Sequence, residues 1–286
     1  MRFPHTVQAR RTRRRVLSVP SVAAWFVIAM LVFASAYGAE PSALARARTL
    51  YNAADYDGAI AEAATARMQP TTADAAALVE ARAHLERFRH GADPADLDGA
   101  REALNAIHAA VLSPRDQVDL LVGLGQSLYL SDMFGSAAEL FDTALERGTV
   151  LPERDRLMVL DWWATSLDRE AQGASPERRA RLAAQIGSRM EEELRRDPGS
   201  APANYWRAVA ARGVGDLETA WDAAVAAWVR ATLSPTASQL RTDIDRLVTE
   251  ALIPERARSR SGSGVDQTDA VEALRSEWNL VKEQWK

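Results

Sequence analysis

Residues 121–148, LVGLGQSLYLSDMFGSAAELFDTALERG, decide the fold class of this chain. Apolar and small residues recur at helical spacing in two halves, with a polar break at Ser131-Asp132 between them. The positions that carry this pattern are Leu121, Leu124, Gly125, Leu128, Phe134, Ala137, Phe141 and Ala144. Such spacing predicts two helices joined by a short turn. The small residues let the two helix backbones approach closely, and the larger residues fill the space between neighbouring hairpins.

The same pattern returns along the chain, clearly in residues 43–70 and 197–228 and more loosely in two further copies. The small residues of the first helices fall at positions 47, 81, 125, 164 and 208, and the matching second-helix positions are 59, 100, 137, 186 and 220. No run of alternating β-branched residues indicates a strand. Three Ser-Pro pairs, at 113–114, 175–176 and 234–235, are typical of helix starts. The sequence therefore predicts an all-α chain of short antiparallel helices.

This unit resembles the tetratricopeptide repeat (TPR), a helix-turn-helix motif with a small residue in each helix and an aromatic residue in the second. The steps from 47 to 81 and from 186 to 220 match the period of about 34 residues that is typical of that family. The resemblance implies a right-handed solenoid of about five helical hairpins over residues 40–252, similar to exported bacterial members of the family. It also implies a concave groove that is lined by the first helices and binds a peptide or partner protein.

Ten residues are expected to line that groove when the family's register is carried over to this chain. They are Arg48, Asn52, Arg82, Gln126, Tyr129, Asp161, Thr165, Arg169, Tyr205 and Arg212. Arginine can hold a carboxylate through two parallel hydrogen bonds, and tyrosine offers a rigid contact area. The alternative is that these residues are simply exposed polar positions of helices.

The C-terminal part departs from the repeat pattern. Residues 253–265 have the composition of a flexible linker. Residues 266–286 are predicted to form an amphipathic helix, because Val271, Leu274, Trp278, Val281 and Trp285 recur every three or four residues. This helix either caps the end of the solenoid or docks on another chain.

The N-terminal residues 1–36 are predicted to form a signal peptide. Arginines at positions 10–15 precede an apolar run over 22–33 and small residues at 34–36, which is the order of a secretory signal. We therefore expect a periplasmic or secreted protein, with inner-membrane anchoring through residues 19–36 as the alternative. Without residues 1–36, which hold six arginines and no acidic residue, 29 basic residues (35 − 6) face 39 acidic ones, a net charge of −10.

The sequence carries no motif for catalysis, a cofactor or a metal. There is no cysteine, which excludes disulfides and thiol chemistry, and the acidic balance argues against binding nucleic acid. His84 and His90 lie six residues apart and thus on different helix faces. We expect a non-enzymatic scaffold without stable membrane insertion once the signal is cleaved. The alternatives are an enzyme or enzyme subunit with its site in the groove, and a small-ligand binder among the tryptophan-rich helices of the second half.

Overall fold

The computed structural model describes residues 41–147, 150–233, 237–262 and 266–285. The chain separates into residues 1–42 and residues 43–286, and all helices below belong to the second unit. The expected signal peptide (1–36), the alternative anchor (19–36) and the helix start at Ser234-Pro235 lie outside the described residues. No helix in the described ranges has the length and apolar character needed to cross a membrane.

The described chain is all-α, without a strand in any described residue, which confirms the all-α part of the prediction. The helices are α2 (Ala43–Asn52), α3 (Tyr56–Arg67), α4 (Ala73–Gly91), α5 (Pro94–Asn105), η1 (Ala109–Val111), α6 (Pro114–Tyr129), α7 (Phe134–Glu146), α8 (Glu153–Gln172), α9 (Pro176–Arg196), α10 (Ala201–Gly213), α11 (Leu217–Thr232), α12 (Ser238–Arg246), η3 (Leu247–Leu252), α13 (Ile253–Ser261) and α14 (Gln267–Gln284). Of these, η1 is a 3₁₀ turn and η3 is a π-helical segment.

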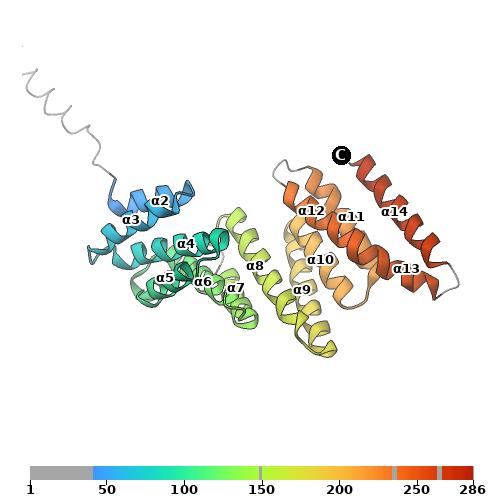
Figure 1. Ribbon diagram of the computed structural model, residues 1–286, viewed down its shortest axis with the longest axis horizontal. Helices are drawn as coiled ribbons and strands as arrows, with labels where there is room; N and C mark the ends of the chain where they lie inside the picture. The colour runs from blue at the N-terminus through green and yellow to red at the C-terminus, as the bar shows by residue number, and fades with distance from the viewer. Residues whose placement is uncertain (1–40, 148–149, 234–236, 263–265, 286) are drawn as a thin grey trace, which may run out of the picture. The chain divides into compact units, whose positions relative to one another are not determined.

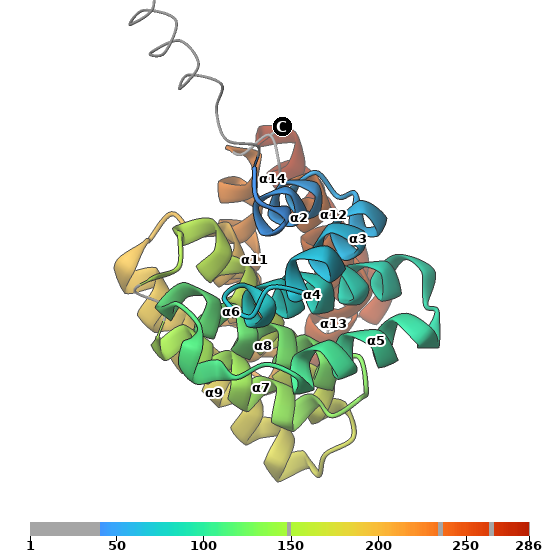
Figure 2. The same ribbon diagram turned by 90° about the vertical axis from the view of Figure 1, so that its left-hand side faces the viewer.

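Helices that follow one another in the chain pack side by side in pairs (Figures 1 and 2). The pairs are α2 with α3, α4 with α5, α6 with α7, α8 with α9, and α10 with α11. The first helices of these pairs also pack against one another, because α2 contacts α4, α4 contacts α6, and α8 contacts both α6 and α10. Side chains from α2, α4, α6 and α8 can therefore meet on one surface.

The residues predicted to pack the hairpins lie in the interior. Each of the four first-helix alanines (Ala47, Ala81, Ala164 and Ala208) has an exposed fraction of 0%, and the second-helix positions 59, 100, 137 and 220 are also 0% exposed. At Gly125 a Cβ atom would lie 2.7 Å from Cε1 of Phe141, well inside van der Waals contact. Glycine is therefore required at position 125 for α6 and α7 to approach this closely.

Tryptophan supplies much of the packing in the second half. Trp163, Trp206, Trp221 and Trp278 are 1–6% exposed, so they belong to the core. Trp162 and Trp228 are half-buried, and Trp285 is 41% exposed.

The same turn connects three of the hairpins. Ala54, Asp132 and Gly215 have φ angles of 60°, 58° and 85°, and each lies two residues before its second helix begins. The following residue in each case donates its N–H to the carbonyl five residues back: Asp55 to Leu50, Met133 to Leu128, and Asp216 to Ala211. This left-handed helix ending satisfies the last carbonyls of the first helix and reverses the chain.

Replacing Ala54 by glycine is expected to raise the free energy of unfolding by about 0.5–1 kcal/mol, because a left-handed conformation strains any residue with a Cβ atom. Replacing the neighbouring Ala53 by glycine is expected to lower the free energy of unfolding by about the same amount. The Ala53 N–H bonds to the Thr49 carbonyl as in a regular helix, where glycine loses more conformational freedom than alanine on folding. Both alanines are exposed, so Ala53→Gly is a matched control for Ala54→Gly when the two variants are compared by urea denaturation. Equal changes of the same sign would contradict the left-handed turn.

The segment expected to be a flexible linker is helical over most of its length. Residues 253–261 form α13, and Ile253 and Ala257 are 1% and 0% exposed. The prediction of a linker over 253–265 is therefore wrong for 253–261. The arginine-rich composition suggested a solvated linker, but arginine side chains can also cover apolar surface. Here the guanidinium of Arg256 lies over the Trp221 ring, 4.7 Å from its centroid.

The apolar stripe of α14 is buried within its own chain. Leu274 and Trp278 are 0% and 1% exposed, and they belong to the same core as Trp221 and Leu252. The indole Nε1 of Trp278 donates to Asp245 Oδ1 at 2.8 Å, and Lys282 Nζ donates to the same oxygen at 2.9 Å. These contacts favour capping over docking on another chain.

Candidate binding site

A polar recess of about 470 Å³ opens on the surface that α2, α4, α6 and α8 share. Three of the predicted groove residues meet in it: Arg48 and Asn52 from α2, and Arg82 from α4. The remaining lining residues are Tyr51, Leu78, Val79, Ser113, Arg115, Asp116, Asp119 and Asp155. Every one of them comes from a first helix or its N-cap.

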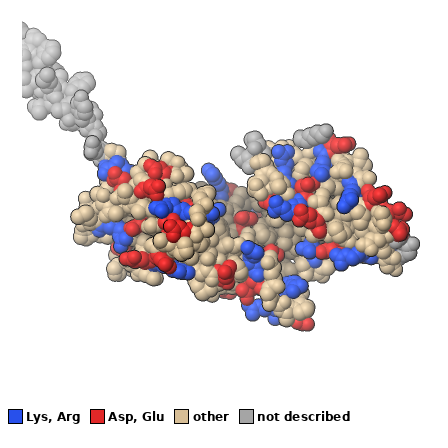
Figure 3. All heavy atoms as spheres, in the orientation of Figure 1, with Lys and Arg blue, Asp and Glu red and all other residues tan. Residues whose placement is uncertain are grey.

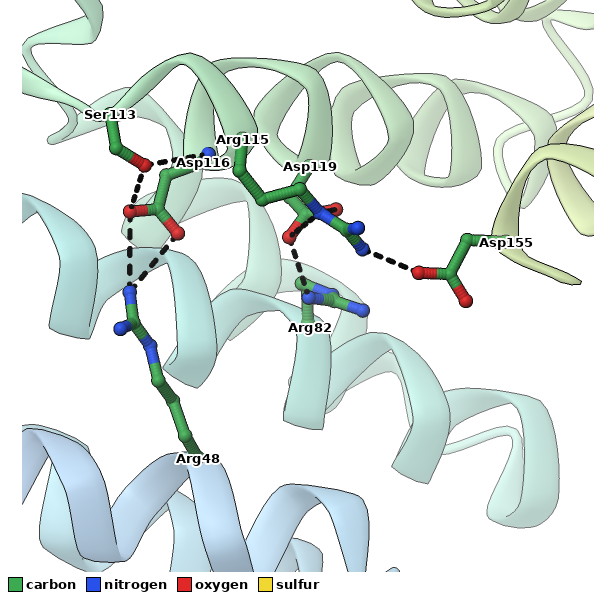
Figure 4. Close-up of polar contacts among 7 residues, drawn as sticks. All are labelled: Arg48, Arg82, Ser113, Arg115, Asp116, Asp119 and Asp155. Carbon is green, nitrogen blue, oxygen red and sulfur yellow. Dashed lines mark hydrogen bonds and ion pairs between the residues drawn. The ribbon is translucent and has the colours of Figure 1, made fainter. Parts of the chain in front are cut away.

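The start of α6 supplies the middle of this recess. Ser113 is the N-cap, and its Oγ accepts the Asp116 N–H at 3.1 Å and donates to Asp116 Oδ2 at 2.8 Å. Pro114 follows in the first helical turn, where its missing N–H costs nothing. This cap confirms the helix start predicted at Ser113-Pro114, and it orients the Asp116 carboxylate toward α2 (Figure 4).

Three arginines and three aspartates connect four helices across the recess (Figure 4). Arg48 Nη2 donates to Asp116 Oδ1 and Oδ2 at 3.0 and 3.2 Å, which joins α2 to α6. Arg82 Nη1 of α4 donates to Asp119 Oδ2 at 3.3 Å. Arg115 bonds Asp119 through Nε at 3.2 Å and Asp155 of α8 through Nη2 at 2.6 Å.

In two of these ion pairs the arginine side chain is more exposed than the aspartate side chain. The side chain of Arg48 is 47% exposed against 18% for Asp116, and that of Arg82 is 24% exposed against 12% for Asp119. The arginine side chains are therefore the more accessible partners of these two ion pairs. Acidic and basic side chains are interspersed over the face shown in Figure 3.

The ion pairs and burial shift the pKa of two groups here. Burial alone would lower the pKa of the Arg115 guanidinium, but its bonds to Asp155 and Asp119 outweigh burial and raise it. Burial raises the pKa of the Tyr51 hydroxyl, although the Arg82 guanidinium opposes the shift. Both groups therefore keep their ordinary charge at neutral pH.

A second recess of about 500 Å³ shares Arg48, Ser113 and Asp116 with the first. It extends past the N-terminal end of α2 to Val111, whose side chain is exposed. The two recesses border the same three residues, so a ligand longer than one recess can contact both.

An aromatic cluster lies where α4, α6 and α8 meet. The ring centroids of Tyr129 and Trp162 are 5.0 Å apart in an edge-to-face arrangement, and Trp162 stacks on Phe141 at 5.9 Å. The guanidinium of Arg89, from α4, lies 5.3 Å from the Trp162 ring centroid. Tyr129 was predicted to line the groove, and it is half-buried in this cluster.

Gln126 corrects the predicted set. Its side chain faces the interior and the residue is 6% exposed, so a ligand on the surface does not reach it. It follows Gly125 on α6, and the close approach of α6 to its neighbours covers both positions. The repeat register predicted that Gln126 lines the groove. The register gives the direction of a side chain on its own helix, but not how far neighbouring helices bury it.

The predicted residues on α8 and α10 lie apart from the recess. Asp161 accepts a hydrogen bond from Trp206 Nε1 at 2.8 Å, and desolvation raises the pKa of its carboxyl although this hydrogen bond opposes the shift. Burial, with Asp243, Asp161 and Asp168 nearby, raises the pKa of Tyr205 to about 12. Thr165 is half-buried on the same helix as Asp161.

The two remaining predicted arginines border other hollows. Arg169 lies 5.9 Å from the Phe134 ring centroid, beside a pocket at the end of α8. Arg212 holds Glu255 of α13 through Nε and Nη2, at 2.7 to 3.0 Å. It also borders a largely apolar cavity of about 350 Å³ between α8, α9 and α10.

Sequence reasoning missed most of the residues that build the recess. The missed residues are Tyr51, Arg115, Asp116, Asp119 and Asp155. A sequence signal exists only for Arg115, Asp116 and Asp119, which belong to the charged segment RDQVD after Ser113-Pro114. Arg48 and Asp116 are 68 residues apart in the chain, and the repeat register does not specify that they form a pair.

The recess contains no histidine, and two histidines elsewhere contact aspartates. His84 Nδ1 lies 2.8 Å from Asp96 Oδ1, and His108 Nδ1 lies 3.2 Å from Asp74 Oδ1. In the part of the chain that the structure describes, no group of three or more His, Cys, Asp or Glu side chains could hold a metal ion.

Fold and site together define an all-α protein of paired helices with a charged surface recess across its first helices. Comparisons of the chain with protein-family models, with curated proteins and with solved structures found no match.

Proposed function

We propose that the protein is a right-handed solenoid of about five TPR-like hairpins, capped by α14, that binds a peptide or partner protein. The burial of the packing positions and the turn repeated at Ala54, Asp132 and Gly215 support equivalent hairpins. The direct packing of α2 on α4 and of α4 on α6 supports a surface made of first helices, as in such solenoids.

The observation that carries the binding proposal is the recess of about 470 Å³, whose lining comes only from first helices and the N-cap of α6. The first helices of four successive hairpins contribute to it, so the recess runs across the hairpins rather than within one of them. A segment of another protein laid across the hairpins would contact several helices at once, which is how extended repeat surfaces bind. We propose this role rather than catalysis because the recess offers paired guanidiniums and carboxylates and no histidine.

The cavity between α8, α9 and α10 supports a second candidate function, the binding of a small ligand. Its volume of about 350 Å³ falls in the range of small-molecule sites, and Ala183, Ile186 and Val209 give it apolar walls. A ligand there would change the fluorescence of nearby Trp206, which belongs to the same core as Ile186.

The proposed location is the periplasm or the cell exterior, with anchoring in the inner membrane through residues 19–36 as the alternative. This proposal rests on the order of charged, apolar and small residues in the sequence of residues 1–36.

A bulky side chain at Asn52 tests the binding proposal. Asn52 is exposed and lines the recess, so Asn52→Trp is expected to weaken binding of peptides selected from a random display library by at least about tenfold, or 1.4 kcal/mol. Ala64→Trp, on an exposed position of α3 outside the recess, is the matched control and should leave affinity unchanged. Fluorescence polarisation measures both. If the two variants bind alike, the recess is not the binding surface.

A further inference from the structure

Two arginines of α4 face the same side of that helix. Arg82 and Arg89 are seven residues apart, which corresponds to two helical turns and about 10.5 Å along the axis. Arg82 lines the recess, and Arg89 lies beside the aromatic cluster at the other end of this surface. A ligand that follows α4 therefore passes two arginine positions that lie two helical turns apart.

Both guanidiniums are held against aromatic rings from neighbouring helices. Arg82 lies 4.7 Å from the ring centroid of Tyr51 in α2, and Arg89 lies 5.3 Å from that of Trp162 in α8. A stacked guanidinium has lost much of its rotational freedom before a ligand arrives. Binding then costs less conformational entropy than at a freely moving arginine.

The carboxylate partners each bond only one nitrogen of these guanidiniums. Asp119 bonds only Nη1 of Arg82, and Glu86 bonds only Nη1 of Arg89, at 3.0 and 2.8 Å. The Arg89 side chain is 42% exposed against 15% for Glu86, which repeats the outward orientation seen at Arg82. Each arginine is thus paired, through one guanidinium nitrogen, with a carboxylate that is less exposed than itself.

We infer that the partner is an extended acidic segment of another protein, with two carboxylates three residues apart. This inference rests on the proposed function and specifies its ligand. In a polyproline II conformation residues i and i+3 lie on one side of the chain, about 9.3 Å apart, close to the spacing of about 10.5 Å between positions 82 and 89 along the axis of α4. An extended chain also reaches Arg82, whose side chain is only 24% exposed, more readily than a helix about 10–12 Å wide.

Short synthetic peptides test the inference on the full-length protein. A fluorescein-labelled peptide with the core Glu-Pro-Pro-Glu is expected to bind at least about tenfold more tightly than the same peptide with Gln-Pro-Pro-Gln or Lys-Pro-Pro-Lys. A core of Glu-Pro-Glu, with its carboxylates too close to span both arginines, should bind more weakly than Glu-Pro-Pro-Glu. Fluorescence polarisation gives the affinities, and circular dichroism verifies that each protein variant is folded.

Variants of the two arginines assign the contacts. Arg82→Gln and Arg89→Gln are each expected to weaken Glu-Pro-Pro-Glu binding by about tenfold. Arg89→Lys should recover only part of that loss, because lysine keeps the charge but lacks the planar fork. Arg101→Gln is the control, since Arg101 is an exposed arginine of α5 that pairs with Asp98.

The outcomes separate this inference from the function on which it rests. Equal binding of the glutamate and glutamine peptides, no binding of either, or binding unaffected by both Arg→Gln changes would overturn the acidic ligand. In those cases the proposed function still stands if Asn52→Trp weakens library-selected peptides. If Asn52→Trp has no effect on them, the proposed function itself fails.

Discussion

Replacing Trp278 by alanine is expected to lower the free energy of unfolding by about 3–5 kcal/mol, the range for removing a large buried aromatic side chain. Trp278 is 1% exposed, and its ring centroid lies 6.2 Å from that of Trp221 and 5.4 Å from that of Trp228. The change leaves a cavity, removes two edge-to-face contacts and deletes the hydrogen bond to Asp245. Urea denaturation followed by circular dichroism measures the loss.

Trp285→Ala in the same segment is the matched control. Trp285 is 41% exposed, and the hydrogen bond it receives from Trp228 Nε1 is made by its backbone carbonyl, which alanine keeps. We expect this variant to lose no more than about 1 kcal/mol. A loss at position 278 as small as the one expected at 285 would mean that α14 is not packed on the core, and would favour its interpretation as a helix that docks on another chain.

Replacing Arg156 by methionine is expected to destabilise the protein by about 3–5 kcal/mol, because it leaves the Glu193 carboxylate buried without its main partner. Arg156 of α8 and Glu193 of α9 are 6% and 5% exposed, and Arg156 Nη2 donates to Glu193 Oε1. Arg196 Nη1 is 3.7 Å from the other oxygen of Glu193 and compensates only weakly at that distance.

The double variant Arg156→Met/Glu193→Leu shows whether the pair itself stabilises the fold. We expect its stability to return to within about 1 kcal/mol of the parent, because apolar side chains remove the desolvation penalty of both charges. The buried Nη1 of Arg156 already lacks a hydrogen-bond partner, which makes the pair less than fully satisfied. A double variant as unstable as Arg156→Met alone would show that packing at these positions matters more than the charge.

The hairpins could be predicted because their pattern is local. Ala47, Ala137 and Ala220 were identified from spacing alone, and each is 0% exposed in the structure. Helical periodicity, N-caps such as Ser113 and turn residues act within a few positions of one another, so a single sequence contains the whole signal. The linker prediction failed over residues 253–261 for the opposite reason, since the Arg256 guanidinium of α13 packs on Trp221 from another helix.

The recess was only partly predictable. Arg48, Asn52 and Arg82 followed from the register of the first helices, and they do meet in space. Asp116, Asp119 and Asp155 are their partners only because α2, α4, α6 and α8 lie next to one another. Gln126 occupies an equivalent register position and is buried instead.

The amino-acid sequence by itself determined where the helices and turns lie and which small residues pack between them, because these depend on contacts within a few residues. Only the tertiary structure decided which arginine faces which carboxylate, and that the side chains of Arg48 and Arg82 are more exposed than those of Asp116 and Asp119. The physical reason is distance along the chain. Arg48 and Asp116 are 68 residues apart, so they form an ion pair only because packing brings α2 and α6 together.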